Sequence, residues 1–281
     1  MNIAAALIAT REVLQRSGVA DPGREAASLL AFALKRPPTF LIAHPEHELT
    51  INENAMFAES VKRRSNREPF QYIVGSQEFY GLDFEISPDV LIPRPETEIL
   101  VEDAIKSLQG LTDPTFCEIG VGSGCISVSI LHNVANSTAV GIDISEQALA
   151  MARRNAAKHE VLKRIQFCKG DVFDGVTGKF DLIVSNPPYI PVADIPGLQP
   201  EVLNFEPHLA LVGGSDGLDV VRRIVLDAPE YLTPRGVLLV EIGFGQSEPV
   251  RELFDLFMWE TPDSLPDLQG VRRVLKVRAR S

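Results

Sequence analysis

The chain has 281 residues, of which 45% are hydrophobic and 23% are charged, as in soluble globular proteins. This composition excludes a disordered or collagen-like chain, and no apolar run reaches the roughly 20 residues that span a membrane. Lys and Arg number 27 against 38 Asp and Glu, which gives a formal charge of −11. Because broad contact with nucleic-acid phosphates requires a basic face, we expect no direct DNA binding. We also expect no membrane partner, since no apolar run is long enough to span a membrane.

The first part of the sequence has the periodicity of helices. Apolar residues recur at spacings of three and four between Ile3 and Leu34. Asp21-Pro22 is typical of a helix start and Pro37-Pro38 of a helix end, and a further helix is predicted from about 52 to 64. We therefore predict a small helical domain over residues 1–66. The apolar N-terminus lacks a basic start, so it does not resemble a secretion signal.

Residues 67–95 change to a pattern typical of strands. The segments 71–75 and 78–86 are predicted as two strands, with apolar residues alternating at 82, 84 and 86 in the second. Gly75-Ser76 is the predicted turn between them. This stretch is interpreted as a β-hairpin linker between two domains.

From residue 96 to 281, predicted strands and helices alternate. Five strands are predicted, at 115–119, 138–143, 165–169, 180–185 and 236–242. Four helices are predicted, at 97–108, 124–134, 146–158 and 216–231. This order predicts an α/β domain with a Rossmann-like, mostly parallel sheet covered by helices on both faces. Ligands of such sheets bind at the carboxyl ends of the strands.

A glycine-rich loop follows the first predicted strand of this domain. Gly120, Gly122 and Gly124 have the spacing GxGxG and open a predicted helix, where backbone N–H groups are free to meet a ligand. Asp143 lies nineteen residues after Gly124, at a strand end, where its carboxylate can accept both hydroxyls of a ribose. A dinucleotide-binding loop has the spacing GxGxxG, so a nicotinamide dehydrogenase is disfavoured. The pattern resembles S-adenosylmethionine-dependent methyltransferases.

Three further residues are candidates for holding that cofactor. Glu118 lies two residues before Gly120 and is placed to meet the ammonium group of the methionine part. Asp171 and Val172 follow the third predicted strand of the domain, where they can meet the amino group and the ring face of adenine.

The fourth predicted strand of the domain runs into Asn186-Pro187-Pro188-Tyr189. An amide nitrogen is a poor nucleophile, because its lone pair is shared with the carbonyl group, so its methylation needs orientation and electrostatic help. The side-chain carbonyl of Asn186 and the backbone carbonyl of Pro187 can accept both hydrogens of a planar NH₂ group. Tyr189 offers an aromatic face, and the prolines stiffen the loop. No metal is expected, since the five histidines form no ligand set.

These motifs, together with the stretches 66–84, 91–98, 206–218 and 236–243, resemble the HemK/PrmC family of peptide chain release factor glutamine methyltransferases. The resemblance implies a methyl transfer from S-adenosylmethionine to the glutamine side chain of a Gly-Gly-Gln motif. It implies that the cofactor touches Gly120, Val121, Gly122, Ser123, Gly124, Asp143, Val172 and Asn186 and is bordered by Arg94–Thr97. Together with Glu118 and Asp171, these residues form the predicted cofactor site. It implies that Asn186, Pro187, Pro188 and Tyr189 bind the glutamine, with Asn186, Pro187 and Tyr189 catalytic. The helical domain and the hairpin would hold the release factor.

Other functions remain open at this point. A ribosomal-protein glutamine methyltransferase shares the same motifs. An adenine-N6 nucleic-acid methyltransferase could also use Asn-Pro-Pro-Tyr, but it must extract a base and hold the backbone, which the acidic charge disfavours. A cofactor-binding partner of the ribosome without activity would not need Asn186 and Tyr189. Three cysteines without paired spacing indicate a reducing compartment, the cytoplasm, and we expect a monomer.

Overall fold

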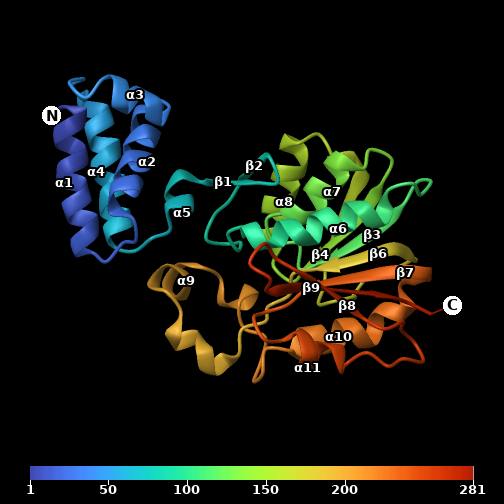
Figure 1. The fold of residues 1–281 in the computed structure, drawn as a ribbon. Coiled ribbons are helices and arrows are strands. Elements are labelled where there is room, and N and C mark those ends of the chain that lie inside the picture. Colours follow the sequence, from blue (N-terminus) through green and yellow to red (C-terminus); the bar gives the residue numbers. More distant parts are fainter. Residues whose placement is uncertain (281) are drawn as a thin grey trace. The chain divides into compact units, whose positions relative to one another are not determined.

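The computed structural model of the protein describes residues 1–280 and consists of two compact units (Figure 1). The first, called the helical unit here, contains Met1–Ser76 and Gln199–Phe205. The second, called the sheet unit, contains Gln77–Leu198 and the chain from Glu206 onward. The predicted linker 67–95 is therefore divided, because residues 67–76 belong to the helical unit and residues 77–95 to the sheet unit. No helix within residues 1–280 is long and apolar enough to cross a membrane.

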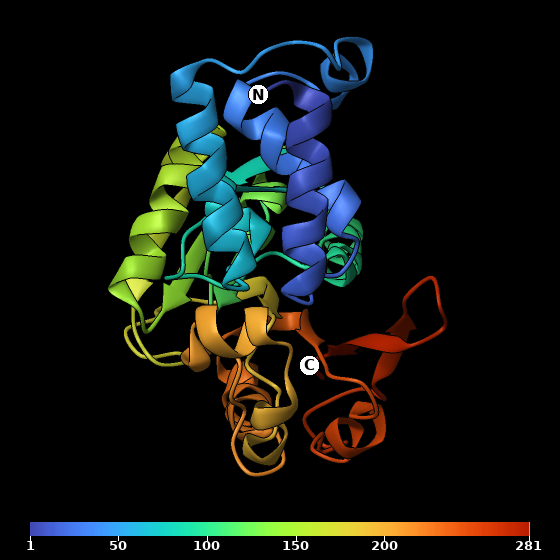
Figure 2. The same cartoon turned by 90° about the vertical axis from the view of Figure 1, so that its left-hand side faces the viewer.

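The helical unit is built from short helices around one apolar core. Its helices are α1 (Ile3–Arg16), α2 (Pro22–Leu34), α3 (Pro38–Ala43), α4 (Ile51–Ser65), α5 (Phe70–Val74) and α9 (Pro200–Phe205). Leu14, Leu29, Leu30 and Phe57 are buried together in its core. Helix α4 begins at a capping box, in which Thr50 and Glu53 satisfy each other's backbone N–H groups. Figure 2 shows α1 and α4 lengthwise, with α9 at the end of α4.

The predicted strand 71–75 is wrong, because residues 70–74 form helix α5. Pro69 precedes this helix, and Gly75 ends it in a left-handed conformation with a φ of 77°. A short apolar run between Pro and Gly fits either a strand or a buried helical turn, and here the packing of Tyr72 and Ile73 decides for the helix.

The hairpin exists, but its turn is five residues later than predicted. Strands β1 (Ser76–Phe79) and β2 (Leu82–Glu85) form a two-stranded sheet joined at Tyr80-Gly81. Both turn residues have positive φ, 52° for Tyr80 and 74° for Gly81, as a two-residue hairpin turn requires. The backbone N–H of Tyr80 donates to Glu98 at 2.9 Å, which offsets part of the cost of this conformation for a tyrosine.

A buried ion cluster joins α9 to the other helices of the helical unit. The Arg64 side chain is only 5% exposed and bridges Glu25 of α2, at 2.5 Å, and Glu201 of α9, at 3.0 Å. Arg67 makes a second ion pair with Glu201 at 2.5 Å. The segment Gln199–Phe205, which follows 122 residues of the sheet unit along the chain (77–198), is thus bound by charge to helices that precede that stretch.

Replacing Arg64 by alanine is expected to destabilise the helical unit by about 3 kcal/mol. Glu25 loses its ion-pair partner, and Glu201 loses one of its two partners, at partly buried positions. Hydrogen exchange of the α2 and α4 amides measures this change. The control is Arg16→Ala, which removes an exposed pair with Glu12 on α1 and should cost less than about 0.5 kcal/mol. Equal effects of both substitutions would contradict the role of the cluster.

The sheet unit has seven strands in the order β5-β4-β3-β6-β7-β9-β8. These are β3 (Thr115–Ile119), β4 (Thr138–Asp143), β5 (Ile165–Lys169), β6 (Phe180–Ser185), β7 (Leu232–Glu241), β8 (Asp263–Pro266) and β9 (Arg272–Arg278). The first five are parallel, as predicted, whereas β9 is antiparallel to both β7 and β8. Strands β8 and β9 were not predicted from the sequence.

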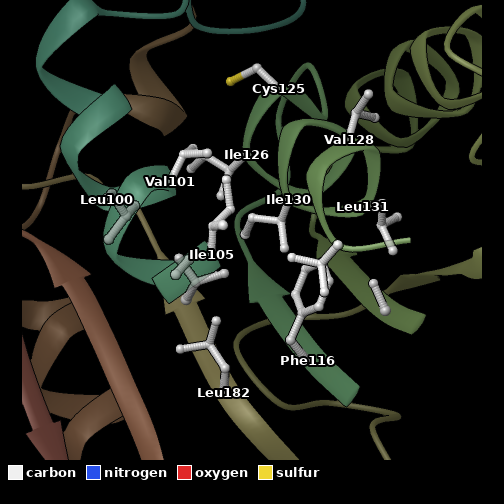
Figure 3. Close-up of a cluster of buried hydrophobic side chains, with 14 of the residues drawn as sticks. Leu100, Val101, Ile105, Phe116, Cys125, Ile126, Val128, Ile130, Leu131 and Leu182 are labelled. Carbon is white, nitrogen blue, oxygen red and sulfur yellow. The ribbon is translucent and has the colours of Figure 1, made fainter. Parts of the chain in front are cut away.

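Helices cover both faces of this sheet. They are α6 (Glu98–Leu108), α7 (Cys125–Asn133), α8 (Glu146–Lys158), α10 (Asp219–Asp227) and α11 (Ser247–Arg251). Alternation along each strand separates two cores, so Phe116 faces α6 and α7, as Figure 3 shows, whereas Cys117 faces α10. The chain leaves β3 toward β4 on one side and later returns to β6 on the other. The point where strand order reverses therefore lies between β3 and β6.

Candidate active site

The two predicted motifs meet where the order of the strands reverses. Ile119 and Ser185 are register partners at the ends of β3 and β6, and the Ser185 hydroxyl donates to the Ile119 carbonyl at 2.8 Å. Gly120 and Asn186 follow directly, and a β-carbon on Gly120 would lie 4.0 Å from the Asn186 carbonyl oxygen. Parallel pairing thus brings the glycine loop and Asn-Pro-Pro-Tyr to one place.

The three glycines of the loop have different structural roles. All have positive φ, and the N–H of Gly120 donates to the Ile142 carbonyl at 2.8 Å. A β-carbon on Gly124 would lie 3.1 Å from that of Ala152, so this glycine permits close packing of α7 on α8. A β-carbon on Gly122 would meet nothing within 4 Å. Gly120 and Gly122 therefore border open space that a ligand can occupy.

Asp143 ends β4 with its carboxylate held by two backbone N–H groups. Gly122 donates to one oxygen at 2.8 Å and Ser145 to the other at 2.9 Å. Burial raises the pKa of this carboxyl, and hydrogen bonds from the backbone of Ser145, Gly122 and Ile144 oppose the rise. A carboxylate has about four acceptor sites, so the group is fixed in place and still able to accept a hydrogen bond from a ligand.

Two of the predicted cofactor residues direct their side chains into the protein. Val121 is buried against Leu149 and Ala152, and Ser123 is buried with its carbonyl accepting from Asn155 at 2.8 Å. Both residues are buried as a whole, so Gly120, which is exposed, and Gly122, which is half-buried, are the loop residues that border the open space.

Glu118 is fully buried beneath the glycine loop. One carboxylate oxygen accepts from the backbone and the hydroxyl group of Ser127, whereas Oε1 has no hydrogen-bond partner among residues 1–280. Burial raises the pKa of Glu118 to about 8. An unpartnered buried oxygen is costly, and a cation beside it would remove the cost. The residues present thus fit a ligand with an ammonium group.

The turn after β5 contains Asp171 and Val172. The Asp171 carboxylate already pairs with Arg223 of α10 at 3.0 Å and is half exposed. Val172 is buried and has a φ of 58°, a strained conformation for a β-branched residue. The structure therefore places a strained apolar residue at the strand end, and the predicted adenine contact of Asp171 stays a prediction.

The Asn-Pro-Pro-Tyr loop is held in place by backbone hydrogen bonds to the segment after η4 (His208–Ala210). Ile190 N–H donates to the Leu211 carbonyl and Gly213 N–H to the Ile190 carbonyl, both at 2.9 Å. A β-carbon on Gly213 would lie 2.6 Å from the Pro188 oxygen, and one on Gly217 would collide with the Tyr189 oxygen. Glycine is required at both positions because the two backbones touch.

Asn186, Pro187, Pro188 and Tyr189 all lie at this edge. Pro187 is buried and the other three are half-buried, so the loop faces both the core and open space. Burial raises the pKa of Tyr189 to about 12, and the charge of Glu241 adds to the rise. Its phenol group is therefore neutral across the physiological pH range.

Three further residues contact this loop; Thr97 lies in the segment 94–97 that was expected to border the cofactor site, whereas Gln246 and Glu241 were not predicted from the sequence. Thr97, in η1 (Pro95–Thr97), accepts from the Asn186 side-chain nitrogen at 3.2 Å. Gln246 donates to the Tyr189 carbonyl at 2.9 Å. Glu241 is buried at the end of β7. A carboxylate at the end of a predicted buried strand was the available signal for Glu241, whereas no motif of the sequence pointed to Gln246.

Residues 5–75 match the family model described as PrmC N-terminal domain, and residues 96–194 match the one described as Methyltransferase small domain. A protein of Geobacter sulfurreducens named release factor glutamine methyltransferase is 44% identical over 270 residues, which cover 94% of each chain. A protein of the same name from Koribacter versatilis is 38% identical and covers 93% of each. This chain belongs to the release factor glutamine methyltransferases. The family resemblance drawn from its motifs is confirmed.

Solved structures place this release factor glutamine methyltransferase chain in a wider fold. The ribosomal protein L11 methylase of Lactobacillus delbrueckii subsp. bulgaricus has a TM-score of 0.50 at 17% identity, covering 70% of this chain and 84% of that one. A methyltransferase of Pyrococcus furiosus has the same score and identity, covering 72% and 91%. At such identity the likeness concerns the fold alone, and it confirms the predicted methyltransferase sheet.

Proposed function

We propose that this protein transfers a methyl group from S-adenosylmethionine to the side-chain amide nitrogen of the glutamine in the Gly-Gly-Gln motif of peptide chain release factors. The observation that carries the proposal is the position of Asn-Pro-Pro-Tyr beside the glycine loop in a member of this family. S-adenosylmethionine supplies a methyl group on a positively charged sulfur.

The residues at the carboxyl ends of β3 and β4 would hold that cofactor. Asp143, held in place by Gly122 and Ser145, would accept hydrogen bonds from the ribose hydroxyls. Glu118 would face the ammonium group with its unpartnered Oε1. The positive φ of Gly120 and Gly122, with no side chains, would let the ligand lie against the backbone.

The loop after β6 would hold the glutamine. Asn186 and Pro187 would each accept one hydrogen of the substrate NH₂ with a carbonyl oxygen, while Tyr189 lines the amide plane. This grip aims the nitrogen at the methyl group and stabilises the positive charge that develops on the nitrogen. As the nitrogen gains the methyl group, the bond from that carbon to sulfur breaks and the sulfur is left as a neutral thioether. The nitrogen loses one of its two hydrogens as a proton to water, so the product is a neutral secondary amide.

In this proposal the helical unit recognises the release factor. Its support is that residues 5–75 match a family model separate from the methyltransferase domain, so this part of the chain distinguishes the family from other enzymes of the same fold. The protein would act as a monomer without contacting DNA, which accords with the net charge of −11.

Mass spectrometry of a folded release factor, incubated with the protein and S-adenosylmethionine, tests the function. We expect one added methyl group, located on the tip glutamine, and none on a factor in which that glutamine is replaced by alanine. Ribosomal proteins and adenine-containing duplex DNA serve as competing substrates. Methylation of either at a higher rate than the release factor would overturn the proposal.

Glu118 is expected to release about one proton per site when S-adenosylmethionine binds at pH 7. With a pKa of about 8, this carboxyl is mainly protonated before binding, and a facing ammonium group lowers its pKa. Calorimetry in phosphate and in Tris, which differ in ionisation enthalpy, measures the proton count. The variant Glu118→Gln should bind without this release, and an unchanged proton count in that variant would contradict the contact.

A further inference from the structure

Glu241 is a buried acidic residue to which the proposed chemistry assigns no role. It ends β7, where its residue is only 2% exposed, and its Oε2 has no hydrogen-bond partner among residues 1–280. Val240 is the register partner of Ser185 on β6. Asn186 follows Ser185, and Glu241 follows Val240. Asn186 and Glu241 therefore both lie at the carboxyl ends of adjacent parallel strands.

The side chains of Thr97 and Asn186 form a polar group with Glu241. The Asn186 amide nitrogen donates to the Thr97 hydroxyl oxygen at 3.2 Å, and Thr97 is itself buried. Burial raises the pKa of Glu241 to about 7, whereas hydrogen bonding from Thr97 and from Asn186 lowers it. All three side chains thus interact in a site with little water, where such bonds are strong.

The direction of the hydrogen bonds in this group follows from the number of donors and acceptors on each side chain. An ionised carboxylate only accepts hydrogen bonds, so the Thr97 hydroxyl directs its single hydrogen to Glu241. The Thr97 oxygen is then left to accept, and the Asn186 nitrogen is the donor that it meets. The amide nitrogen of Asn186 is consequently held on the side of Thr97 and Glu241, and its Oδ1 lies on the opposite side of the amide.

We propose that Glu241, together with Thr97, is a positioning residue that orients the Asn186 amide so that its oxygen, and not its nitrogen, is offered to the substrate NH₂. This inference rests on the proposed function, since it concerns the same site. An amide turned by 180° would direct N–H donors at the N–H groups of the glutamine, which repels the substrate and opposes the developing positive charge.

The pH dependence of the reaction reports on this role. The charged groups that act on Glu241 are Arg273 of β9, which lowers its pKa, and Glu96 of η1, which raises it. Tyr189 and Cys125 also face its charge, but both have pKa values of about 12 and stay neutral. Above about pH 7 the carboxylate only accepts, whereas below it the protonated group also donates and the fixed direction is lost. We expect kcat to fall as the pH decreases through about 7.

The test compares Glu241→Gln, Thr97→Val and Thr97→Ser with the unchanged protein on a folded release factor. Glu241→Gln keeps the size but adds a donor, so kcat should fall about 10-fold to 100-fold, with the KM for the factor changed less than about threefold. The fall in kcat near pH 7 should disappear. Thr97→Val should lower kcat similarly, and Thr97→Ser, which keeps the hydroxyl, should restore it.

A double substitution separates positioning from a general structural effect. In an Asn186→Ala background Glu241→Gln should have almost no further effect on kcat, because the side chain it orients is absent. Glu102→Gln, an exposed carboxylate on α6, is the matched control and should leave kcat unchanged. Cofactor affinity measured by calorimetry shows that each variant is folded.

Several outcomes would overturn the inference. They are a kcat of Glu241→Gln within about threefold of the unchanged protein, a loss matched by an equal loss of cofactor affinity, full additivity with Asn186→Ala, or no rescue by Thr97→Ser. The proposed function fails separately, if the unchanged protein does not methylate the tip glutamine at all.

Discussion

Replacing Asn186 by alanine is expected to lower kcat for release factor methylation about 10³-fold. The substitution removes the side-chain oxygen proposed to accept one hydrogen of the glutamine NH₂, and with it the stabilisation of positive charge on the nitrogen. It also leaves Thr97 and the buried carboxylate of Glu241 without their amide donor. Single-turnover transfer of a labelled methyl group to a purified release factor measures the effect.

Asn186→Asp separates the oxygen from the nitrogen of this side chain. It keeps the size and an acceptor oxygen, but it places a second carboxylate next to Glu241, so we expect a loss nearly as large as that of the alanine variant. Asn136→Ala, at an exposed position next to the amino end of β4, is the matched control and should retain full activity. Full activity of Asn186→Ala would contradict the proposed mechanism.

Asp143→Ala is expected to weaken the binding of S-adenosylmethionine about 10²-fold to 10⁴-fold. Hydrogen bonds to a charged group contribute about 1.5–3 kcal/mol each, and two ribose hydroxyls lose their acceptor in this variant. The N–H groups of Gly122 and Ser145 also lose theirs, so the glycine loop is held less firmly. Calorimetric titration with the cofactor measures the affinity.

The matched control for this variant is Asp181→Ala, which lies near the amino end of β6 and thus at the opposite end of the parallel strands. Asp181 likewise accepts a backbone N–H, that of Thr115 at 2.9 Å, so both variants lose a buried structural contact. Both should therefore unfold at lower denaturant concentration, but only Asp143→Ala should lose cofactor affinity. Equal losses of affinity in the two variants would mean that Asp143 acts through the fold and not through the ribose.

The parallel core of the sheet unit was predicted closely from the sequence. Strands β3 to β6 and helix α8 have the bounds expected from their apolar runs, because buried parallel strands and amphipathic helices carry strong local patterns. The antiparallel strand β9 was missed, since Arg272, Arg273 and Lys276 interrupt its apolar pattern. Its strand conformation is stabilised by pairing with β7, which its own residues do not indicate.

The errors around residues 70–82 have a common cause. Residues 70–74 form a helix, although Ile73 and Val74 favour strands, because Tyr72 and Ile73 gain burial in the helical unit. The hairpin turns at Tyr80-Gly81, although a bulky tyrosine seldom takes a positive φ. Its backbone is held by Glu98, eighteen residues later, which a local pattern cannot reveal.

The sequence by itself determined the motifs on which the proposed chemistry rests. The glycine loop, Asp143 and Asn-Pro-Pro-Tyr are each encoded within a few neighbouring residues, and the order of the strands brings them to one edge. Only the tertiary structure decided what lies behind Asn186, where Thr97 and Glu241 come from segments 89 and 55 residues away. It also decided that Glu201 of α9 pairs with Arg64. Such contacts depend on strand register and buried charge, which are properties of the folded chain and leave no periodic pattern in the sequence.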